Sequence, residues 1–290
     1  MKKKVKALRG ELFLPGDKSI SHRGVLLSSL AKGKSRIRNL LSAEDVTMSR
    51  RLVEMIGAEI SDHGEEITVL GKGASGLGEP SDVLYAGNSG TTMRIGSGIL
   101  AAIDGLSIIT GDRYLRKRPM ERITTPLSKM GATVLGRDNG RYPPLVIRGG
   151  NLQSIRYEMP VASAQVKSAI LVAAAAQGVE AEVKEPLPTR DHTEKMLQSM
   201  GADVSRSGDW IKISPHGELR PLDVDVPADF SAAAFFIVAA LVTPRSEIVA
   251  RNVLVNPLRS GMLRVLARMG ARIELTNERV VSGEEIADIV

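Results

Sequence analysis

Four copies of one short pattern, spaced almost evenly along the chain of 290 residues, constrain its fold more than any other feature. The copies are Gly57-Ala58-Glu59-Ile60, Gly131-Ala132-Thr133-Val134, Gly201-Ala202-Asp203-Val204 and Gly270-Ala271-Arg272-Ile273. Successive glycines are separated by 74, 70 and 69 residues. Each glycine suits the left-handed end of a helix, and a strand is expected after it. A repeat of this length is a small folding unit in itself, so the chain is predicted to contain four similar units.

Each unit is predicted to contain two helices with different surroundings. The helix that ends at the repeated glycine carries one apolar stripe, as at Met48, Leu52, Met55 and Ile56. The other helix begins with small or capping residues and then runs apolar on most faces, as in 169–176. A helix that is apolar all round is buried. The four expected starts are Asp17-Lys18-Ser19, Gly87-Asn88-Ser89-Gly90-Thr91, Ala162-Ser163-Ala164-Gln165 and Ala228-Asp229-Phe230-Ser231.

Short strand-like runs follow the apolar helices, at residues 35–40, 106–110, 179–183 and 247–253. This order predicts an α/β (α+β) fold of repeated βαβαββ units, with mixed sheets outside and buried helices inside. If the repeat relates the helices, their polar first turns, with Lys18, Asn88, Gln165 and Asp229, can point at one place. The alternative is that small residues at these starts only allow close packing of helices.

The segment 14–23, Leu-Pro-Gly-Asp-Lys-Ser-Ile-Ser-His-Arg, brings polar groups to the start of the first apolar helix. The N–H groups in the first turn of a helix have no partner inside the helix, and the helix dipole makes them positive. Lys18, Ser19 and Arg23 add an ammonium, a hydroxyl and a planar guanidinium at the same spot. These groups predict a site for a phosphate or a carboxylate. The alternative is a helix cap beside two solvated cations.

Two further segments are candidates for the same anion site. Gly90 has no Cβ, so a ligand can approach the backbone at this helix entry. The entry is not a Walker loop, because the terminal Gly-Lys-Ser/Thr is missing. Arg118 ends the cationic run 113–118 and precedes Pro119, which fixes its direction. The alternative for this run is a solvated charge cluster.

The run Thr-Arg-Asp-His-Thr-Glu at 189–194 opens another helix. Asp191 is predicted to be its N-cap, with Glu194 completing a capping box. Arg190 precedes the cap and is expected to face the anion site, whereas His192 is expected to be exposed and structural. Asp229 is likewise predicted to be an N-cap. The sequence shows neither a Ser/His/Asp triad nor a carboxylate pair set for acid–base work.

The amino-acid composition excludes several classes of site and partner. The chain has no cysteine and four scattered histidines, so neither disulfides nor a metal site is expected, and no cofactor is predicted. Its formal charge is +6, but aromatic residues make up only 3%, too few to stack bases, so a small polyanionic substrate is expected rather than nucleic acid. No apolar run approaches the ~20 residues of a membrane helix. The basic start Met1-Lys2-Lys3-Lys4 lacks an apolar signal core, so a cytoplasmic protein with no membrane partner is expected.

Taken together, six segments resemble the 5-enolpyruvylshikimate-3-phosphate (EPSP) synthase family, the 3-phosphoshikimate 1-carboxyvinyltransferases. The segments are residues 14–23, 87–94, 117–120, 162–168, 189–194 and 256–259. The resemblance implies an enolpyruvyl transferase-like fold of two domains and a transferase of the shikimate pathway, which leads to chorismate and the aromatic amino acids. The implied reaction moves the enolpyruvyl group of phosphoenolpyruvate to the 5-hydroxyl of shikimate 3-phosphate and releases phosphate. It implies no cofactor, and it implies that glyphosate occupies the phosphoenolpyruvate site.

The resemblance also assigns site residues. It implies binding of shikimate 3-phosphate by Lys18, Ser19, Arg23, Ser163, Ala164, Gln165 and Arg190. It implies binding of phosphoenolpyruvate by Lys18, Gly90, Arg118 and Gln165. Members of the family are longer and have more repeats, so the catalytic carboxylates are expected beyond Val290, and no catalytic residue is identified in this chain.

The implied domain organisation is one complete domain of three repeats at 14–227. Residues 1–13 and 228–290 would form part of a second domain, with the substrates in the cleft between the two domains and a monomeric parent enzyme. Two alternatives remain for the function. One is an inactive chain that binds only the anionic substrate. The other is a relative of the transferase that acts on UDP-N-acetylglucosamine, in which many members use a cysteine that this chain lacks.

Overall fold

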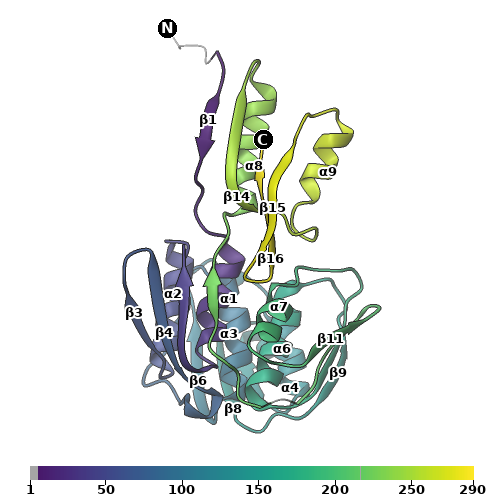
Figure 1. Ribbon diagram of the computed structural model, residues 1–290. Coiled ribbons are helices and arrows are strands. Elements are labelled where there is room, and N and C mark those ends of the chain that lie inside the picture. The colour runs from purple at the N-terminus through teal and green to yellow at the C-terminus, as the bar shows by residue number, and fades with distance from the viewer. Residues whose placement is uncertain (1–5, 216) are drawn as a thin grey trace.

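A computed structural model describes residues 6–215 and 217–290 (Figure 1). The basic start at Met1-Lys2-Lys3-Lys4 lies outside the described residues. The chain forms two bodies, one above the other in Figure 1. We call residues 14–227 the larger body, and residues 6–13 with 228–290 the smaller body. Both the first described residues and the C-terminus lie in the smaller body.

Four sheets of four strands each share one topology. In every sheet the first strand pairs in parallel with the second, and the remaining pairs are antiparallel. The smaller body has the order β1 (Arg9–Leu12), β14 (Glu247–Leu254), β16 (Glu284–Ile289), β15 (Leu275–Val281). The larger body has three such sheets. The first has the order β13 (Asp223–Asp225), β2 (Lys32–Arg38), β4 (Glu66–Lys72), β3 (Glu59–Asp62), and the second the order β5 (Leu84–Tyr85), β6 (Gly105–Thr110), β8 (Tyr142–Gly149), β7 (Thr133–Gly136). The third has the order β9 (Ile155–Glu158), β10 (Ala181–Lys184), β12 (Trp210–Ile213), β11 (Val204–Ser207). The identical order confirms four copies of one unit.

Two units exchange their first strands. β1 precedes the first unit in the chain, yet it pairs with β14 of the fourth unit, while β13 returns to pair with β2 of the first. The chain therefore passes between the bodies twice, and the two passing segments are hydrogen-bonded to each other. The Asp17 N–H donates to the Pro227 carbonyl at 2.7 Å, and the Asp229 N–H donates to the Pro15 carbonyl at 2.9 Å.

The apolar helices of the larger body are buried, as their sequences predict. These helices are α1 (Lys18–Ser28), α3 (Gly90–Ala102) and α6 (Ala164–Gln177). The backbones of α3 and α6 approach so closely that a Cβ on Gly98 would lie 2.3 Å from the Ala169 carbonyl oxygen. The equivalent helix of the smaller body, α8 (Phe230–Val242), buries only Phe230, Ala233 and Ile237.

The amphipathic helices cover the buried ones and end at the repeated glycines. They are α2 (Glu44–Met55), α4 (Glu121–Lys129), α7 (His192–Ser199) and α9 (Gly261–Arg268). Shorter helical turns occur at η1 (Ala74–Gly76), η2 (Leu115–Lys117) and α5 (Arg137–Gly140). The φ angles at Gly57, Gly131, Gly201 and Gly270 are 114°, 109°, 94° and 87°, so all four adopt the positive-φ conformation that the repeat predicts.

The fold class predicted from the repeat is confirmed, with small differences in boundaries. A strand follows each repeated glycine closely in the first three units, but β15 begins only at Leu275 in the fourth. The buried apolar residues form two clusters, one of which lies almost wholly in the larger body and the other in the smaller. Within the part of the chain that the structure describes, no helix is both long and apolar enough to cross a membrane.

Candidate functional site

Side-chain caps define the starts of all four apolar helices. Asp17 Oδ1 accepts hydrogen bonds from the N–H groups of Ser19 and Ile20, at 2.8 and 3.0 Å. Asp229 Oδ1 accepts from the Ser231 N–H at 2.6 Å, which confirms its predicted role as an N-cap. The other two caps are Ser89 and Ser163, which accept from the N–H groups of Thr92 and Val166. The first turns of these helices are thus fixed, and their polar side chains can be placed relative to one another.

Lys18 and Gln165 both lie against the start of α3. Lys18 Nζ forms an ion pair with Asp45 Oδ2 in the first turn of α2, and the Asp45 carbonyl accepts a hydrogen bond from Thr92 at 3.2 Å. Gln165 Nε2 donates to the hydroxyl of the neighbouring Thr91 at 2.9 Å. Polar groups at the starts of α1, α2, α3 and α6 are therefore linked, as the hypothesis of one shared site requires.

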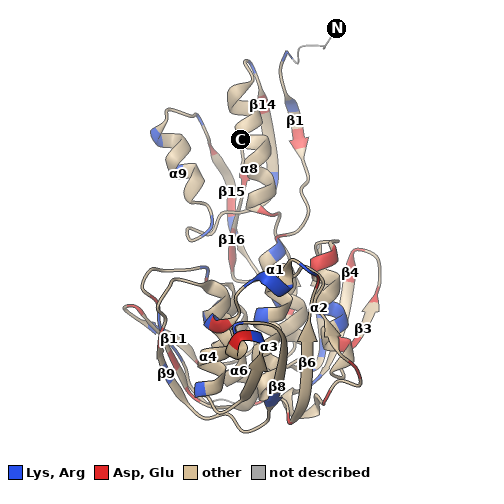
Figure 2. Cartoon of the chain, turned by 180° about the vertical axis from the view of Figure 1, so that it is seen from behind, with Lys and Arg blue, Asp and Glu red and all other residues tan. Residues whose placement is uncertain are grey.

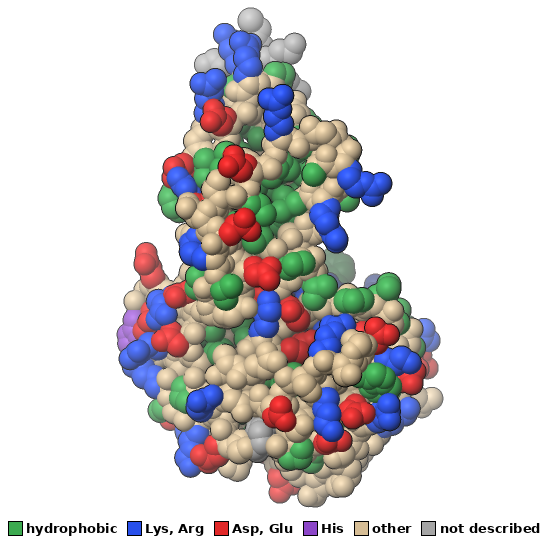
Figure 3. Space-filling view, turned by 45° about the vertical axis from the view of Figure 1, so that its right-hand side comes forward, with side chains coloured by type: hydrophobic (Ala, Val, Ile, Leu, Met, Phe, Trp, Pro, Cys, Tyr) green, Lys and Arg blue, Asp and Glu red, His purple; other side chains and the backbone are tan. Residues whose placement is uncertain are grey.

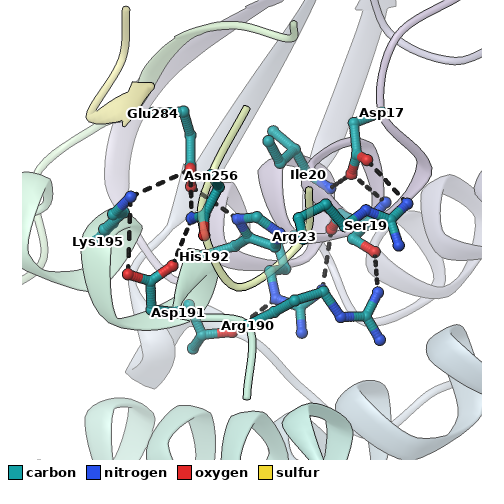
Figure 4. A network of polar contacts seen from close by, with 12 residues as sticks. Asp17, Ser19, Ile20, Arg23, Arg190, Asp191, His192, Lys195, Asn256 and Glu284 are labelled. Atoms are coloured by element: carbon teal, nitrogen blue, oxygen red, sulfur yellow. Dashed lines mark hydrogen bonds and ion pairs between the residues drawn. The ribbon is translucent and has the colours of Figure 1, made fainter. Parts of the chain in front are cut away.

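Ser19, Arg23 and Arg190 lie together at the start of α1 (Figure 4). Arg190 Nη1 donates to Ser19 Oγ at 2.7 Å, so Arg190 faces the start of α1 as the sequence suggests. Arg23 is buried and donates to Thr193 Oγ1, Ser168 Oγ and the Ser19 carbonyl at 2.7, 2.9 and 3.0 Å. Burial, together with the charge of Arg190, lowers the pKa of Arg23 to about 10, which still leaves it charged at neutral pH. A buried cation without a carboxylate bound to it favours an anion nearby.

A second group of cations lies over Gly90. A Cβ at this glycine would lie 2.9 Å from Arg94 Nη1 and 3.3 Å from Arg118 Nη1, so both guanidinium groups rest on its backbone. Arg94 Nη1 also donates to Gln165 Oε1 at 2.8 Å, and Arg118 donates to Asn88 Oδ1. Sequence reasoning missed Arg94. The signal was its position one helical turn after Gly90, which places both on one face of α3.

Electrostatics supports an anion here. Burial, followed by the charges of Arg118 and Arg122, lowers the pKa of Arg94. Burial, followed by the charge of Arg259, lowers the pKa of Arg190. A bound anion would reverse both effects of neighbouring charge. Figure 2 shows Lys and Arg in blue at the start of α1, where the larger body meets the smaller. We call the side chains of Lys18, Ser19, Arg23, Arg94, Arg118, Gln165 and Arg190, with the cap at Ser163 and the first turn at Ala164, the anion site.

Asp191 is the N-cap residue of α7 as predicted, but two other predictions for this helix start are wrong: the capping box with Glu194 and the exposed His192. Asp191 occupies the N-cap position but makes no cap hydrogen bond, and its carboxylate instead accepts from Asn256 at 2.7 Å. Glu194 does not complete a capping box, because it is buried and pairs with Lys167 Nζ at 2.6 Å. His192 is fully buried rather than exposed, and its Nδ1 donates to Glu284 Oε1 at 2.8 Å. All these partners lie far away in the sequence, and their charged bonds compete with local capping.

Comparisons with known proteins agree with this geometry. The family model described as EPSP synthase (3-phosphoshikimate 1-carboxyvinyltransferase) matches residues 2–289. A curated 3-phosphoshikimate 1-carboxyvinyltransferase from Syntrophomonas wolfei is 50% identical over 286 residues, which are 99% of this chain and 67% of the relative. One of the same name from Desulforudis audaxviator is 51% identical over 285 residues, 98% of this chain and 66% of the relative.

A solved structure described as EPSP synthase from Acinetobacter baumannii is also similar to this chain, with a TM-score of 0.91 and 43% sequence identity. The match covers 99% of this chain and 65% of the solved one. The chain thus spans about two thirds of the length of the relatives it matches. On the match of the family model to almost every residue and the identity to curated relatives, the chain belongs to the EPSP synthase (3-phosphoshikimate 1-carboxyvinyltransferase) family.

Proposed function

We propose that this chain supplies the binding site for shikimate 3-phosphate in an enzyme that transfers the enolpyruvyl group from phosphoenolpyruvate to the 5-hydroxyl of that substrate and releases phosphate. The observation that carries the proposal is the convergence of cations from α1, α3, the end of η2 and the segment before α7 around the starts of α1, α3 and α6. Family membership supplies the identity of the substrates.

The side of the site around Ser19 suits the phosphate of shikimate 3-phosphate. Among the described residues, the Arg190 guanidinium makes one side-chain hydrogen bond, to Ser19 Oγ, which leaves its other N–H groups for a ligand. Ser163 and the free N–H groups of the α6 first turn add neutral donors, and the helix dipole favours negative charge at this end. We assign the binding of shikimate 3-phosphate to Lys18, Ser19, Arg23, Ser163, Ala164, Gln165 and Arg190.

The side of the site around Gly90 suits phosphoenolpyruvate. We assign this substrate to Lys18, Gly90, Arg118 and Gln165, with Arg94 as a further cation. Addition of the hydroxyl to the enolpyruvyl group and loss of phosphate both need stabilisation of negative charge, which these cations provide. We propose that Lys18 and Gln165 contact both substrates, with Gln165 held by Arg94 and Thr91 at the start of α3.

Proton transfer is the part of the reaction to which we assign no residue. The reaction needs a proton added to C3 of the enolpyruvyl group and a proton removed from the 5-hydroxyl. Asp45, the carboxylate nearest to Lys18 among the described residues, is already in an ion pair. The second candidate function is therefore binding of the anionic substrate by this chain without turnover.

We also propose that the two bodies are domains, with boundaries at 14–227 and at 1–13 with 228–290, and that the substrates bind where they meet. The two separate apolar clusters support this division. The complete lack of cysteine supports a cytoplasmic location, and we propose a monomeric parent enzyme with small-molecule partners only.

Calorimetric titration of the chain with shikimate 3-phosphate tests the binding part of the proposal. We expect measurable binding that Lys18→Ala weakens about tenfold, the effect of losing one charge-assisted bond. Lys34→Ala, which removes an exposed lysine on β2, is the control and should leave the affinity unchanged. Absence of binding by the wild-type chain would overturn the proposal. A phosphate-release assay with both substrates then separates transfer from binding alone.

A further inference from the structure

The hairpin of β15 and β16 reaches from the smaller body to the start of α7 in the larger body (Figure 4). Its Glu284 carboxylate is buried, with 2% of the side chain exposed, and it accepts a hydrogen bond from His192 Nδ1 at 2.8 Å. Lys195 Nζ, one turn further along α7, lies 3.3 Å from the other Glu284 oxygen. A buried carboxylate on one body is therefore satisfied by donors on the other.

Asn256 completes the contact from the turn after β14. Its Nδ2 donates both to Asp191 Oδ1 at 2.7 Å and to Glu284 Oε2 at 3.1 Å. Its own Oδ1 accepts from the Leu258 N–H at 2.9 Å, which fixes the orientation of the amide. We call Asn256, Glu284, Asp191 and His192 the latch.

Burial alone would raise the pKa of Glu284, but the hydrogen bond from His192 and the charges of His192 and Lys195 hold it below its ordinary value. Glu284 is thus an anion at neutral pH. The carboxylates and the imidazole of the latch resemble a metal-binding group in composition, since their ligand atoms lie within 4.8 Å of one another. Lys195 and Asn256 already supply cationic and amide donors to these oxygens, so the carboxylates are satisfied without an ion, although the buried His192 Nε2 has no hydrogen-bond partner among the described residues.

The segment that the latch holds is the segment that shapes the anion site. Arg190, directly before Asp191, donates to Ser19 Oγ. Thr193, directly after His192, accepts from Arg23 Nε at 2.7 Å and shares a hydrogen bond with Ser168. Arg190 and Thr193 flank the latch residues Asp191 and His192 along four consecutive positions, so a shift of the latch moves both contacts to α1.

We infer that Asn256 and Glu284 are positioning residues, through which the smaller body sets the placement of Arg190 and Thr193 and thereby the affinity of the anion site. The identity of the ligand in this inference rests on the proposed function. Neither residue touches the anion site, and both act through the start of α7. Because coupling between sites is reciprocal, binding of shikimate 3-phosphate must in turn stabilise the latch.

Three variants test the inference on the whole 290-residue chain. Asn256→Asp keeps the size and the bond to the Leu258 N–H but turns the bridging amide into a third carboxylate. Glu284→Gln keeps the size of the side chain, removes its charge and turns one acceptor oxygen into an NH2 group that faces other donors. Glu285→Gln is the matched control, since it makes the same change at the exposed neighbouring residue. Circular dichroism and urea unfolding establish whether each variant folds. If Asn256→Asp does not fold, Glu284→Gln is used for the test.

The first readout needs no ligand. We expect hydrogen exchange of backbone amides in 189–195 to rise at least about tenfold in Asn256→Asp and Glu284→Gln, without an equal rise in the core of α6, and to stay unchanged in Glu285→Gln. A residue that only stabilises the fold would raise exchange throughout. Unchanged exchange in 189–195 would overturn the inference, whatever the ligand of the anion site is.

The second readout is the calorimetric affinity for shikimate 3-phosphate. We expect both latch variants to bind shikimate 3-phosphate about tenfold more weakly than wild type and Glu285→Gln to bind it as wild type does. Wild-type affinity in both latch variants would overturn the inference. A wild-type chain that does not bind shikimate 3-phosphate would instead overturn the proposed function, and the exchange readout would still decide the latch.

Discussion

Asp17 and Asp229 hold equivalent places in the two bodies and are joined through one guanidinium. Each caps the first helix of its own body, and Arg259 Nη2 donates to Asp17 Oδ2 at 3.2 Å and to Asp229 Oδ1 at 3.1 Å. The Lys18 N–H also donates to Asp229 Oδ2 at 3.2 Å. The backbone of Lys18 is therefore hydrogen-bonded to the segment around Asp229 that connects the two bodies. The anion site and the connection between the bodies thus form one structural region.

His22 gives the folded chain a defined sensitivity to acid. It is fully buried, its Nδ1 lies 2.8 Å from Ser49 Oγ, and burial, followed by the charge of Lys18, lowers its pKa to about 3. The unfolded chain takes up a proton near the ordinary pKa of 6.5, whereas the folded chain does not. The stability that His22 contributes is therefore present above pH 6.5 and is lost as the pH falls below it.

The measurement is urea unfolding at pH 7.5 and pH 5. Between pH 7.5 and pH 5, we expect the free energy of unfolding of the wild type to fall by about 2 kcal/mol more than that of His22→Gln, because glutamine does not titrate. His63→Gln changes an exposed histidine and should lose as much as the wild type. Equal losses in wild type and His22→Gln would show that His22 titrates normally in the folded chain.

Lys167 should be indispensable to the larger body. Its ammonium is fully buried between Glu194 Oε1 at 2.6 Å and Glu185 Oε1 at 3.1 Å. Lys167→Met leaves the buried Glu194 without its cation and Glu185 with Arg206 alone, at 3.5 Å, which costs about 3–5 kcal/mol of unfolding free energy at pH 7.5. Lys212→Met, which breaks an exposed pair with Glu180, should cost less than about 1 kcal/mol.

The loss in Lys167→Met should shrink at acid pH. Burial, partly offset by Lys167, raises the pKa of Glu194, and removal of the lysine takes the offset away. The folded variant then binds protons that the unfolded chain binds only at lower pH, so its stability relative to wild type rises as the pH falls from 7.5 to 5. A loss that grew on acidification would contradict this account of the ion pair.

Gly90→Ala tests which side of the anion site binds phosphoenolpyruvate. The added methyl group meets the ends of two flexible side chains, Arg94 and Arg118, so the fold survives while both guanidinium groups move. We expect about tenfold weaker binding of phosphoenolpyruvate in the presence of shikimate 3-phosphate, and unchanged affinity for shikimate 3-phosphate itself. Gly78→Ala, where a Cβ meets nothing within 4 Å, is the control. Equal weakening of both substrates would refute the separation into two sides.

The exposed face of α8 should make the chain self-associate. Phe235 and Val242 are 79% and 75% exposed, and Phe236, Val238 and Leu241 extend the same apolar surface. Hydrophobic side chains are visible on the smaller body in Figure 3. Sedimentation velocity should show association that increases with concentration and is reduced by Phe235→Asp. Leu135→Asp changes an exposed leucine in the larger body and should leave the association as it is. A monomeric wild-type chain at all concentrations would contradict the prediction.

The four units could be predicted from the repeated glycines, because each of these positions requires a backbone conformation that other residues rarely adopt. Capping residues such as Asp229 indicated where the apolar helices start. The predictions for the start of α7 failed because the bonds of its residues are not local. Asp191 and His192 have the local pattern of a cap, but their partners Asn256 and Glu284 lie 65 and 92 residues away. A local sequence pattern indicates only which hydrogen bonds neighbouring residues can form. A buried charged partner from another unit can form a stronger bond and so replace the local one.

Arg94 shows the same limit within the anion site. Its guanidinium is joined to Gln165, 71 residues away, by the close packing of α3 on α6. That packing depends on small residues such as Gly98, which the sequence presents only as part of an apolar run. Side chains that meet across such a contact become visible only when the helices are placed in space.

The most direct test of the account is a crystal structure of this chain with shikimate 3-phosphate bound. We expect the phosphate oxygens to lie within about 3.2 Å of Arg190 and of donors at the start of α6, with Gln165 at the edge of the ligand. A separate hollow between the bodies, lined by Arg50, Arg251 and Arg279 among others, offers cations elsewhere. A phosphate bound in that hollow, with Arg190 and Ser163 free of ligand, would contradict the account.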